Sequence, residues 1–187
     1  MVWMIVAALM MCLFLVLLYS ALIVASDADD AMEIRAERIM TDVTPVPMPG
    51  ETWVRYPLPL DDELQRYIEH LCKQYEVDAA IIFAIIEAES NCDPYCVGDS
   101  GHSYGLMQIW EECHHDRCVR LGIDNLFSPY QNVLVGIDFF AELMNCGHGI
   151  DWALSWYNSG QGGATEYALR IQNRAEQLRE SSMQMEG

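Results

Sequence analysis

The stretch DAAIIFAIIEAESNCDPYCVGDSGHSYGLMQI, from Asp78 to Ile109, decides the fold of this chain. Its first part is almost wholly apolar and ends on carboxylates, which predicts one buried helix followed by a glycine-rich loop. On a helical wheel of about 100° per residue, isoleucines at three positions lie within about 60° of Glu89, whereas Glu87 points away. We therefore expect Glu89 on the apolar face of the helix.

A carboxyl group on such a face loses hydration, and the negative potential of the helix C-terminus lies nearby. Both effects raise the pKa of Glu89, and a carboxyl group with a raised pKa is suited to general acid catalysis. In the loop that follows, glycines allow close approach of the backbone and polar side chains offer hydrogen bonds. A loop with these groups is suited to binding a polar, uncharged ligand. The polar side chains are those of Ser100, Ser103, Tyr104 and Gln108.

Four short blocks follow one another along the chain. They are AIIEAES at residues 84–90, YGLMQI at 104–109, LGIDNLFSPYQNV at 121–133 and WYNSG at 156–160. In order and spacing they resemble the Slt-type lytic transglycosylases of the goose-type lysozyme superfamily. The resemblance covers roughly residues 60 to 175 and implies a nearly all-α, lysozyme-like helical domain.

The resemblance implies an enzyme that cuts the β-1,4 bond between N-acetylmuramic acid and N-acetylglucosamine in peptidoglycan. Glu89 is implied as its single acid/base, with no metal and no cofactor. It protonates the glycosidic oxygen and then takes the proton of the muramyl C6 hydroxyl, which closes onto C1 as a 1,6-anhydro ring. Tyr157 is implied to hydrogen-bond Glu89. The implied substrate-binding residues are Ser90, Ser100, Gly105, Met107, Gln108, Trp110, Tyr157 and Asn158.

Three other functions stay open from the residues. With Asp93 or Asp99 holding a water molecule, the protein would be a muramidase of the goose-type lysozyme kind that hydrolyses the same bond. It would otherwise be a catalytically silent protein for glycan binding or assembly, against which the retention of Glu89 and Tyr157 argues. The last alternative is a membrane protein whose domain packs against a neighbour, for which a glutamate on an apolar face is an uncompensated cost.

The N-terminal residues 1–26 predict a transmembrane anchor. The run from Val2 to Ala25 carries no charge and is long enough to span a bilayer. A cleaved signal peptide stays open as the alternative, although such a signal usually has a basic start and a shorter apolar core. Residues 27–59 are predicted to form an acidic, proline-rich linker, residues 60–178 the catalytic domain and residues 179–187 a polar tail. We expect the domain on the external, cell-wall side of the membrane.

The chain has 28 acidic and 10 basic residues, a net charge of −18 at pH 7. This charge argues against nucleic acid as a partner. It also argues against electrostatic capture of anionic wall polymers, so glycan binding is expected from stacking and neutral hydrogen bonds. The expected partners are peptidoglycan glycan strands and, through the N-terminal helix, the membrane. An envelope-spanning assembly stays open as a further partner.

The cysteine count predicts disulfides. Six cysteines follow the apolar N-terminal run, an even number that in an exported domain suggests pairing. We expect the pairs Cys92 with Cys96, Cys113 with Cys118, and Cys72 with Cys146. The alternative is a zinc site built from Cys113, Cys118 and the two histidines at 114 and 115, although this spacing fits no familiar zinc pattern.

Apolar periodicity predicts further helices on both sides of the first stretch. Residues 91–103 read as loop, and no alternating run predicts a strand. The expected helices cover residues 61–76, 78–89, 110–120, 131–145, 150–157 and 165–178.

Overall fold

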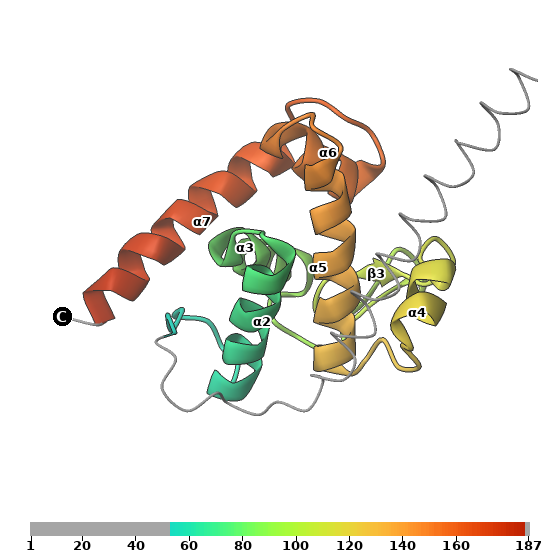
Figure 1. Cartoon of the computed structure of the whole chain (residues 1–187), viewed down its shortest axis with the longest axis horizontal. Helices are drawn as coiled ribbons and strands as arrows, with labels where there is room; N and C mark the ends of the chain where they lie inside the picture. The colour runs from blue at the N-terminus through green and yellow to red at the C-terminus, as the bar shows by residue number, and fades with distance from the viewer. Residues whose placement is uncertain (1–52, 186–187) are drawn as a thin grey trace, which may run out of the picture. The chain divides into compact units, whose positions relative to one another are not determined.

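The computed structural model describes residues 53–185, so the predicted anchor and most of the predicted linker lie outside the described residues. Within these residues no helix is both long and apolar enough to cross a membrane. The elements, in chain order, are α2 (Asp62–Tyr75), α3 (Ala79–Ser90), β1 (Val97–Gly98), β2 (Ser103–Tyr104), β3 (Ile109–Trp110), α4 (His115–Leu121), α5 (Pro129–Asn145), α6 (Ile150–Ser159) and α7 (Glu166–Met185) (Figure 1).

The first two described helices begin at aspartate caps. The side chain of Asp61 accepts a hydrogen bond from the backbone N–H of Leu64 at 2.8 Å, and Asp78 caps α3 through the N–H of Ala80 at 2.9 Å. Each cap satisfies an amide that the first helical turn leaves without a partner. Helix α3 ends where Asn91 takes a left-handed conformation, with φ of 52°. This early stop places Glu89 in the last turn of the helix.

Helix α3 forms the centre of the core. Every residue from Ala80 to Ile86 is buried. The helix packs against α7 along one side and against α2 on another (Figure 1). Burying one isoleucine side chain contributes about 1.5–3 kcal/mol, so this run anchors the domain. The predicted buried helix is confirmed.

A small antiparallel sheet of order β1-β2-β3 lies in the stretch where no strand was predicted. Val97 pairs with Tyr104, and Tyr104 pairs with Ile109. Two of the turn residues between β1 and β2, Asp99 and Ser100, have positive φ and reverse the chain sharply. Strands of two residues are too short for alternation to reveal. The expected helix at 110–120 is also wrong at its start, because Trp110 belongs to β3 and α4 begins at His115.

Both ends of the described region extend beyond the predicted domain limits. Before α2, the side chain of Tyr56 is buried and its backbone N–H donates to Oε1 of Gln65 at 2.9 Å, so the final residues of the predicted linker pack on the domain. At the other end, α7 continues to Met185, within the predicted tail of residues 179–187. Ser182 is buried, and Arg179 forms ion pairs with Asp78 and Glu176. This part of the tail is an ordered helix.

The six cysteines of the described region are free thiols, so the three predicted disulfides are not formed in this structure. Cys72, on α2, is buried in the core of the domain with 2% of its surface exposed, whereas Cys146 lies exposed at the end of α5. The two side chains thus lie in different environments, one in the core and one at the surface. Cys146 instead donates its S–H to the carbonyl oxygen of Glu142.

Candidate active site

The half-buried carboxyl group of Glu89 lies in the last turn of α3. Burial raises its pKa above the ordinary value for glutamate, and the charge of Asp99 adds to this increase. The hydroxyl of Tyr167 and the guanidinium of Arg170 oppose it, because they stabilise the ionised form. The predicted cause, loss of hydration on an apolar face, is therefore the dominant one.

Tyr167, near the start of α7, holds the carboxyl group. Its hydroxyl donates a hydrogen bond of 2.5 Å to Oε1 of Glu89, and the guanidinium of Arg170 lies 5.4 Å from the centroid of its ring. Tyr167 is buried. The sequence does not reveal this role of Tyr167, because no local pattern places residue 167 beside residue 89. The only signal was its position early in a predicted helix that follows a glycine-rich turn.

Tyr157, expected to hydrogen-bond Glu89, has a different partner. Its hydroxyl donates to the carbonyl oxygen of Met107 at 2.8 Å, and its ring packs against Phe139 and Phe140 of α5. The prediction for its hydrogen bond is thus wrong, because Tyr167 occupies that position. Tyr157 still lies near the site, since the charge of Glu89 adds to burial in raising its pKa well above the ordinary tyrosine value. It connects α6 to the backbone of the loop.

Asn132, on α5, fixes the loop that faces Glu89. Its side-chain oxygen accepts from the N–H of Met107 at 2.8 Å, and its amide group donates to the carbonyl oxygens of Tyr104 and Leu126. A side chain at Gly105 would place its Cβ only 2.3 Å from the Asn132 amide nitrogen. The glycine is therefore required for this close approach. The buried amide holds three segments of backbone together.

Some of the predicted substrate-binding side chains are buried or form hydrogen bonds within the domain. The hydroxyl of Ser90 donates to the carbonyl of Ile86, and Met107 is fully buried against Gly136, so its side chain packs in the core instead of facing a sugar. Gln108 is partly exposed, but its amide group donates to two loop carbonyls. These residues shape the wall of the site, and contact of their side chains with sugars stays a prediction.

Other predicted residues do face solvent. Trp110 is 37% exposed, and its ring stacks on His102 with 5.2 Å between centroids. Ser100 and Asn158 are exposed, Ser100 in the turn between β1 and β2 and Asn158 near the end of α6. A stacked, half-exposed indole is the kind of surface on which an apolar ring face binds.

The two candidate aspartates differ in their relation to Glu89. Asp99 accepts a hydrogen bond of 2.5 Å from Ser103, and its charge acts on Glu89. Asp93 instead closes a turn by accepting from the N–H of Tyr95. Asp99 is therefore the aspartate with an electrostatic effect on the site.

The residues expected for the alternative zinc site form no group suited to metal binding. Among residues 53–185 there is no cluster of three or more histidine, cysteine and acidic side chains that would hold a metal ion. His114 packs on Phe139, and burial lowers its pKa to about 4. Cys113 is exposed at the loop before α4.

Comparison with known proteins identifies the family. The family described as Transglycosylase SLT domain matches residues 66–179, which is more than half of the chain. The chain belongs to this family. The predicted resemblance is thereby confirmed, and the four blocks that carried it lie inside the matched range.

Two curated relatives have lytic transglycosylase names. The chain is 29% identical over 137 residues to membrane-bound lytic murein transglycosylase C of Sodalis glossinidius, and 32% identical over 111 residues to membrane-bound lytic murein transglycosylase F 1 of Alkalilimnicola ehrlichii. These matches cover 64% and 54% of the chain, but only 38% and 22% of the relatives. The chain thus spans well under half the length of either relative.

A solved structure confirms the fold. The lytic transglycosylase Slt of Pseudomonas aeruginosa, determined as an inactive glutamate-to-glutamine mutant, matches with a TM-score of 0.56 and 16% identity. The match covers 68% of this chain and 25% of the other. The predicted lysozyme-like helical fold is therefore confirmed for the described domain, with the three short strands as an addition.

Proposed function

We propose that this SLT-domain protein is a peptidoglycan lytic transglycosylase that cleaves the β-1,4 bond between N-acetylmuramic acid and N-acetylglucosamine. The observation that carries the proposal is the environment of Glu89, a half-buried carboxyl group with a raised pKa and a hydroxyl donor at 2.5 Å. The lytic murein transglycosylases among its relatives support the substrate class.

The reaction needs one group that first gives and then takes a proton. Protonated Glu89 gives its proton to the glycosidic oxygen as the bond from that oxygen to C1 of the muramyl ring breaks. The carboxylate then accepts the proton of the muramyl C6 hydroxyl while O6 forms a bond to C1. The product is a 1,6-anhydro ring, no water is consumed, and Glu89 returns to its protonated state.

Tyr167 acts in this mechanism as a positioning residue. Its hydroxyl group fixes one oxygen of Glu89, which leaves the other oxygen for the glycosidic bond. It also stabilises the carboxylate that exists between the two proton transfers. Tyr157 contributes indirectly by holding the carbonyl of Met107, and hence the loop opposite Glu89.

Exposed residues of the loop and of the end of α6 are proposed to bind the sugars. Trp110 offers the face of its ring for stacking, and Ser100 and Asn158 offer neutral hydrogen bonds. Their neutrality suits an acidic domain, which does not attract anionic polymers by long-range forces. The proposed location is the cell-wall side of the membrane, with the N-terminal apolar residues as the anchor.

The experiment is mass spectrometry of fragments released from purified peptidoglycan by the full chain, with Glu89→Gln in parallel. The proposal expects fragments ending in 1,6-anhydro-N-acetylmuramic acid and their loss in the variant. Absence of any release from several wall types would contradict the proposal and favour a glycan-binding protein. Release that survives Glu89→Gln would show that another residue is the acid.

One observation supports hydrolysis as a second candidate. Asp99 is a second carboxylate whose charge reaches Glu89, and a second carboxylate is what a hydrolase uses to activate water. In that case the fragments carry reducing ends and are heavier by one water molecule. Asp99→Asn would then abolish release, whereas a transglycosylase would retain it.

A further inference from the structure

Three aromatic side chains form a column on the outer side of α6. Trp152 and Trp156 are one helical turn apart, and their rings stack with 5.1 Å between centroids and an angle of 20° between planes. His148, just before the helix, continues the column with its ring centroid 4.6 Å from that of Trp152. We call His148, Trp152 and Trp156 the α6 aromatic column. No step of the proposed mechanism uses it.

The two tryptophans of the column point away from the core of the domain. Leu154 is fully buried and lies two residues from each tryptophan, which turns its side chain by about 200° from theirs. The helical register thus directs Leu154 inward and both indoles outward. Trp156 is 38% exposed, although indole is among the largest apolar surfaces that a side chain offers. Two adjacent tryptophans on an outer surface indicate a place where a ligand binds.

The surroundings fix the column and leave it open. The loop after α6 packs its backbone on Trp152, since a Cβ atom at Gly162 would lie only 2.0 Å from the indole nitrogen. Four further glycines flank the helix, and a Cβ atom at any of them would meet no atom within 4 Å outside the adjacent residues. They are Gly147, Gly149, Gly160 and Gly163. Rings that are held in place and left uncovered lose little conformational entropy when a ligand binds.

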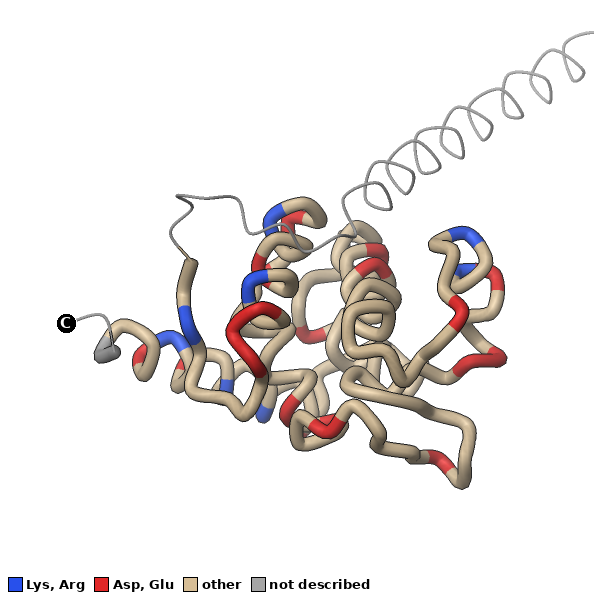
Figure 2. Tube along the Cα trace, turned by 90° about the horizontal axis from the view of Figure 1, so that it is seen from below, with Lys and Arg blue, Asp and Glu red and all other residues tan. Residues whose placement is uncertain are grey.

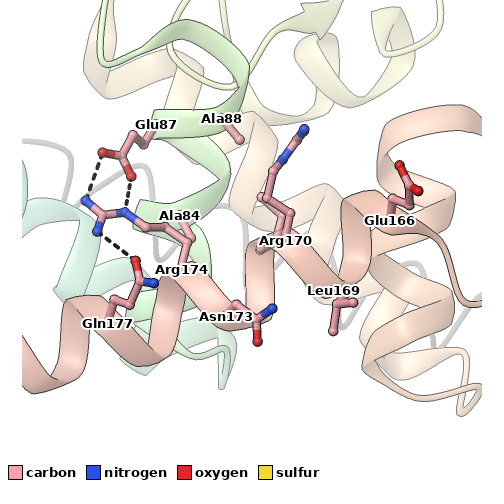
Figure 3. Close-up of a pocket in the computed structure, with 10 residues that line it drawn as sticks. Ala84, Glu87, Ala88, Glu166, Leu169, Arg170, Asn173, Arg174 and Gln177 are labelled. Carbon is pink, nitrogen blue, oxygen red and sulfur yellow. Dashed lines mark hydrogen bonds and ion pairs between the residues drawn. The ribbon is translucent and has the colours of Figure 1, made fainter.

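The surface around the column is nearly without charge. Within residues 146–165, Asp151 is the only aspartate, glutamate, lysine or arginine, and its carboxylate accepts a hydrogen bond of 2.7 Å from Gln172. Figure 2 shows acidic residues spread over the domain and basic residues at few positions. The groove between α3 and α7 differs from the column, because acidic and basic side chains line it (Figure 3). The column therefore suits a ligand that is neutral where it touches the protein.

Sugars are neutral ligands that fit such a surface. The C–H groups on one face of a pyranose ring are apolar and pack on the face of an indole. The hydroxyl and N-acetyl groups at the edge of the sugar pair with neutral donors and acceptors, such as the indole N–H of Trp156 and the amide of the exposed Gln161. The next residue, Tyr157, holds the carbonyl oxygen of Met107 in the catalytic loop. One helix thus carries the column on its outer side and supports the catalytic site on another.

We propose that the α6 aromatic column is a second, non-catalytic binding site for the glycan strands of peptidoglycan. The inference rests on the proposed function, because that reaction acts on the same strands. A strand held on Trp156 keeps the domain on the polymer while another stretch of glycan enters the catalytic site. Two sites for one repeating polymer raise the effective concentration of cleavable bonds at Glu89. The column contributes to binding of the polymer and not to the chemical step.

The first arm of the test measures binding without turnover. The full chain carrying Glu89→Gln is sedimented with purified peptidoglycan, and the unbound fraction gives the dissociation constant. Adding Trp156→Leu is expected to raise this constant about threefold to tenfold, the loss of one stacked ring, whereas Trp156→Phe should retain most of the affinity. The control is Met183→Ala, which removes a 70% exposed apolar side chain near the end of α7 and should change nothing. Unchanged binding in Trp156→Leu would overturn the proposal.

The second arm separates the glycan from other ligands of the same surface. Removal of the peptides from peptidoglycan by an amidase should preserve the effect of Trp156→Leu, because the strand is the ligand. An effect that disappears with the peptides would overturn the proposal. So would a dimer in sedimentation velocity that Trp156→Leu dissociates, because the column would then be a contact between two copies of the chain.

The third arm measures kcat/KM of the chain with Glu89 intact, on insoluble peptidoglycan and on short soluble glycan fragments. Trp156→Leu is expected to lower it on the polymer alone. An equal loss on both substrates would mean that Trp156 acts on the catalytic site through Tyr157, and would overturn the proposal. Binding that needs Trp156, with no fragments released from any wall, would retain this inference and reject the proposed enzyme. Release that does not depend on Trp156 would do the reverse.

Discussion

Two glutamates in the last turns of α3, two residues apart, have opposite environments. Glu89 faces the loop, carries no ion pair in the described region, and accepts a hydrogen bond from Tyr167. Glu87 lines the groove between α3 and α7 and forms a two-contact ion pair with Arg174. Burial raises the pKa of Glu89, whereas the charge of Glu87 is compensated by its partner.

The difference shows how helical register assigns chemistry. A step of two residues turns the side chain by about 200° around the helix, so Glu87 and Glu89 point to opposite sides. On one side the carboxyl group is dehydrated and can remain protonated to higher pH, as a general acid requires. On the other side the carboxyl group forms an ion pair with Arg174 of α7. Residue type alone does not distinguish the two roles.

The largest expected effect is on catalysis. Glu89→Gln removes the only proposed acid/base and should lower fragment release by about a thousandfold or more. Glu87→Gln should change release by less than about tenfold, because Glu87 lies away from the reacting atoms. Release is measured by chromatography of the products from purified peptidoglycan. A similar loss of fragment release in the two variants would contradict the different roles proposed for the two carboxyl groups.

A smaller effect is expected from Tyr167→Phe, about tenfold on kcat, with a change in pH dependence. Activity needs protonated Glu89, so it falls as pH rises through the pKa of that group. The Tyr167 hydrogen bond lowers this pKa, so its removal should move the falling limb to higher pH. The pH profile of kcat/KM is the measurement. As a control, Tyr157→Phe loses its bond to Met107 and should leave the limb in place.

Asp99→Asn should move the same limb in the opposite direction. The negative charge of Asp99 contributes to the raised pKa of Glu89, so neutralising it lowers that pKa and the activity falls at lower pH. The shift should be small, because Asp99 is the last and weakest of the influences on Glu89 and is exposed. The anhydro products should persist. A shift to higher pH would contradict the proposed charge interaction.

The smallest expected effect concerns stability. Glu87→Gln breaks the ion pair with Arg174, which is about one-third exposed on both sides, with 34% for the arginine and 29% for the glutamate. It should lower the free energy of unfolding by about 0.5–1 kcal/mol. Urea denaturation measures this change, and the difference between the proteins should shrink in high salt. A loss of stability that does not depend on salt would mean that Glu87 stabilises the domain by packing and not by its charge.

Much of the fold could be predicted because the helical repeat of apolar residues is visible in short stretches of sequence. The limits of α2 and α3 were expected within about one residue, since aspartate caps and apolar runs mark them. The three strands could not be predicted, because two residues cannot show an alternation. The absence of the three disulfides and the helix at the C-terminal residues could not be predicted either. Both depend on which side chains meet in the folded domain, and local sequence patterns do not show this.

The sequence by itself determined that Glu89 ends a buried helix on its apolar side and that the chain belongs to the SLT family. Both follow from helical periodicity and from short ordered blocks, which are properties of neighbouring residues. Only the tertiary structure decided that Tyr167 and not Tyr157 holds Glu89, and that Arg170 lies over the ring of Tyr167. Residues 89 and 167 are separated by 78 positions, and the packing of α7 on α3 alone brings them together.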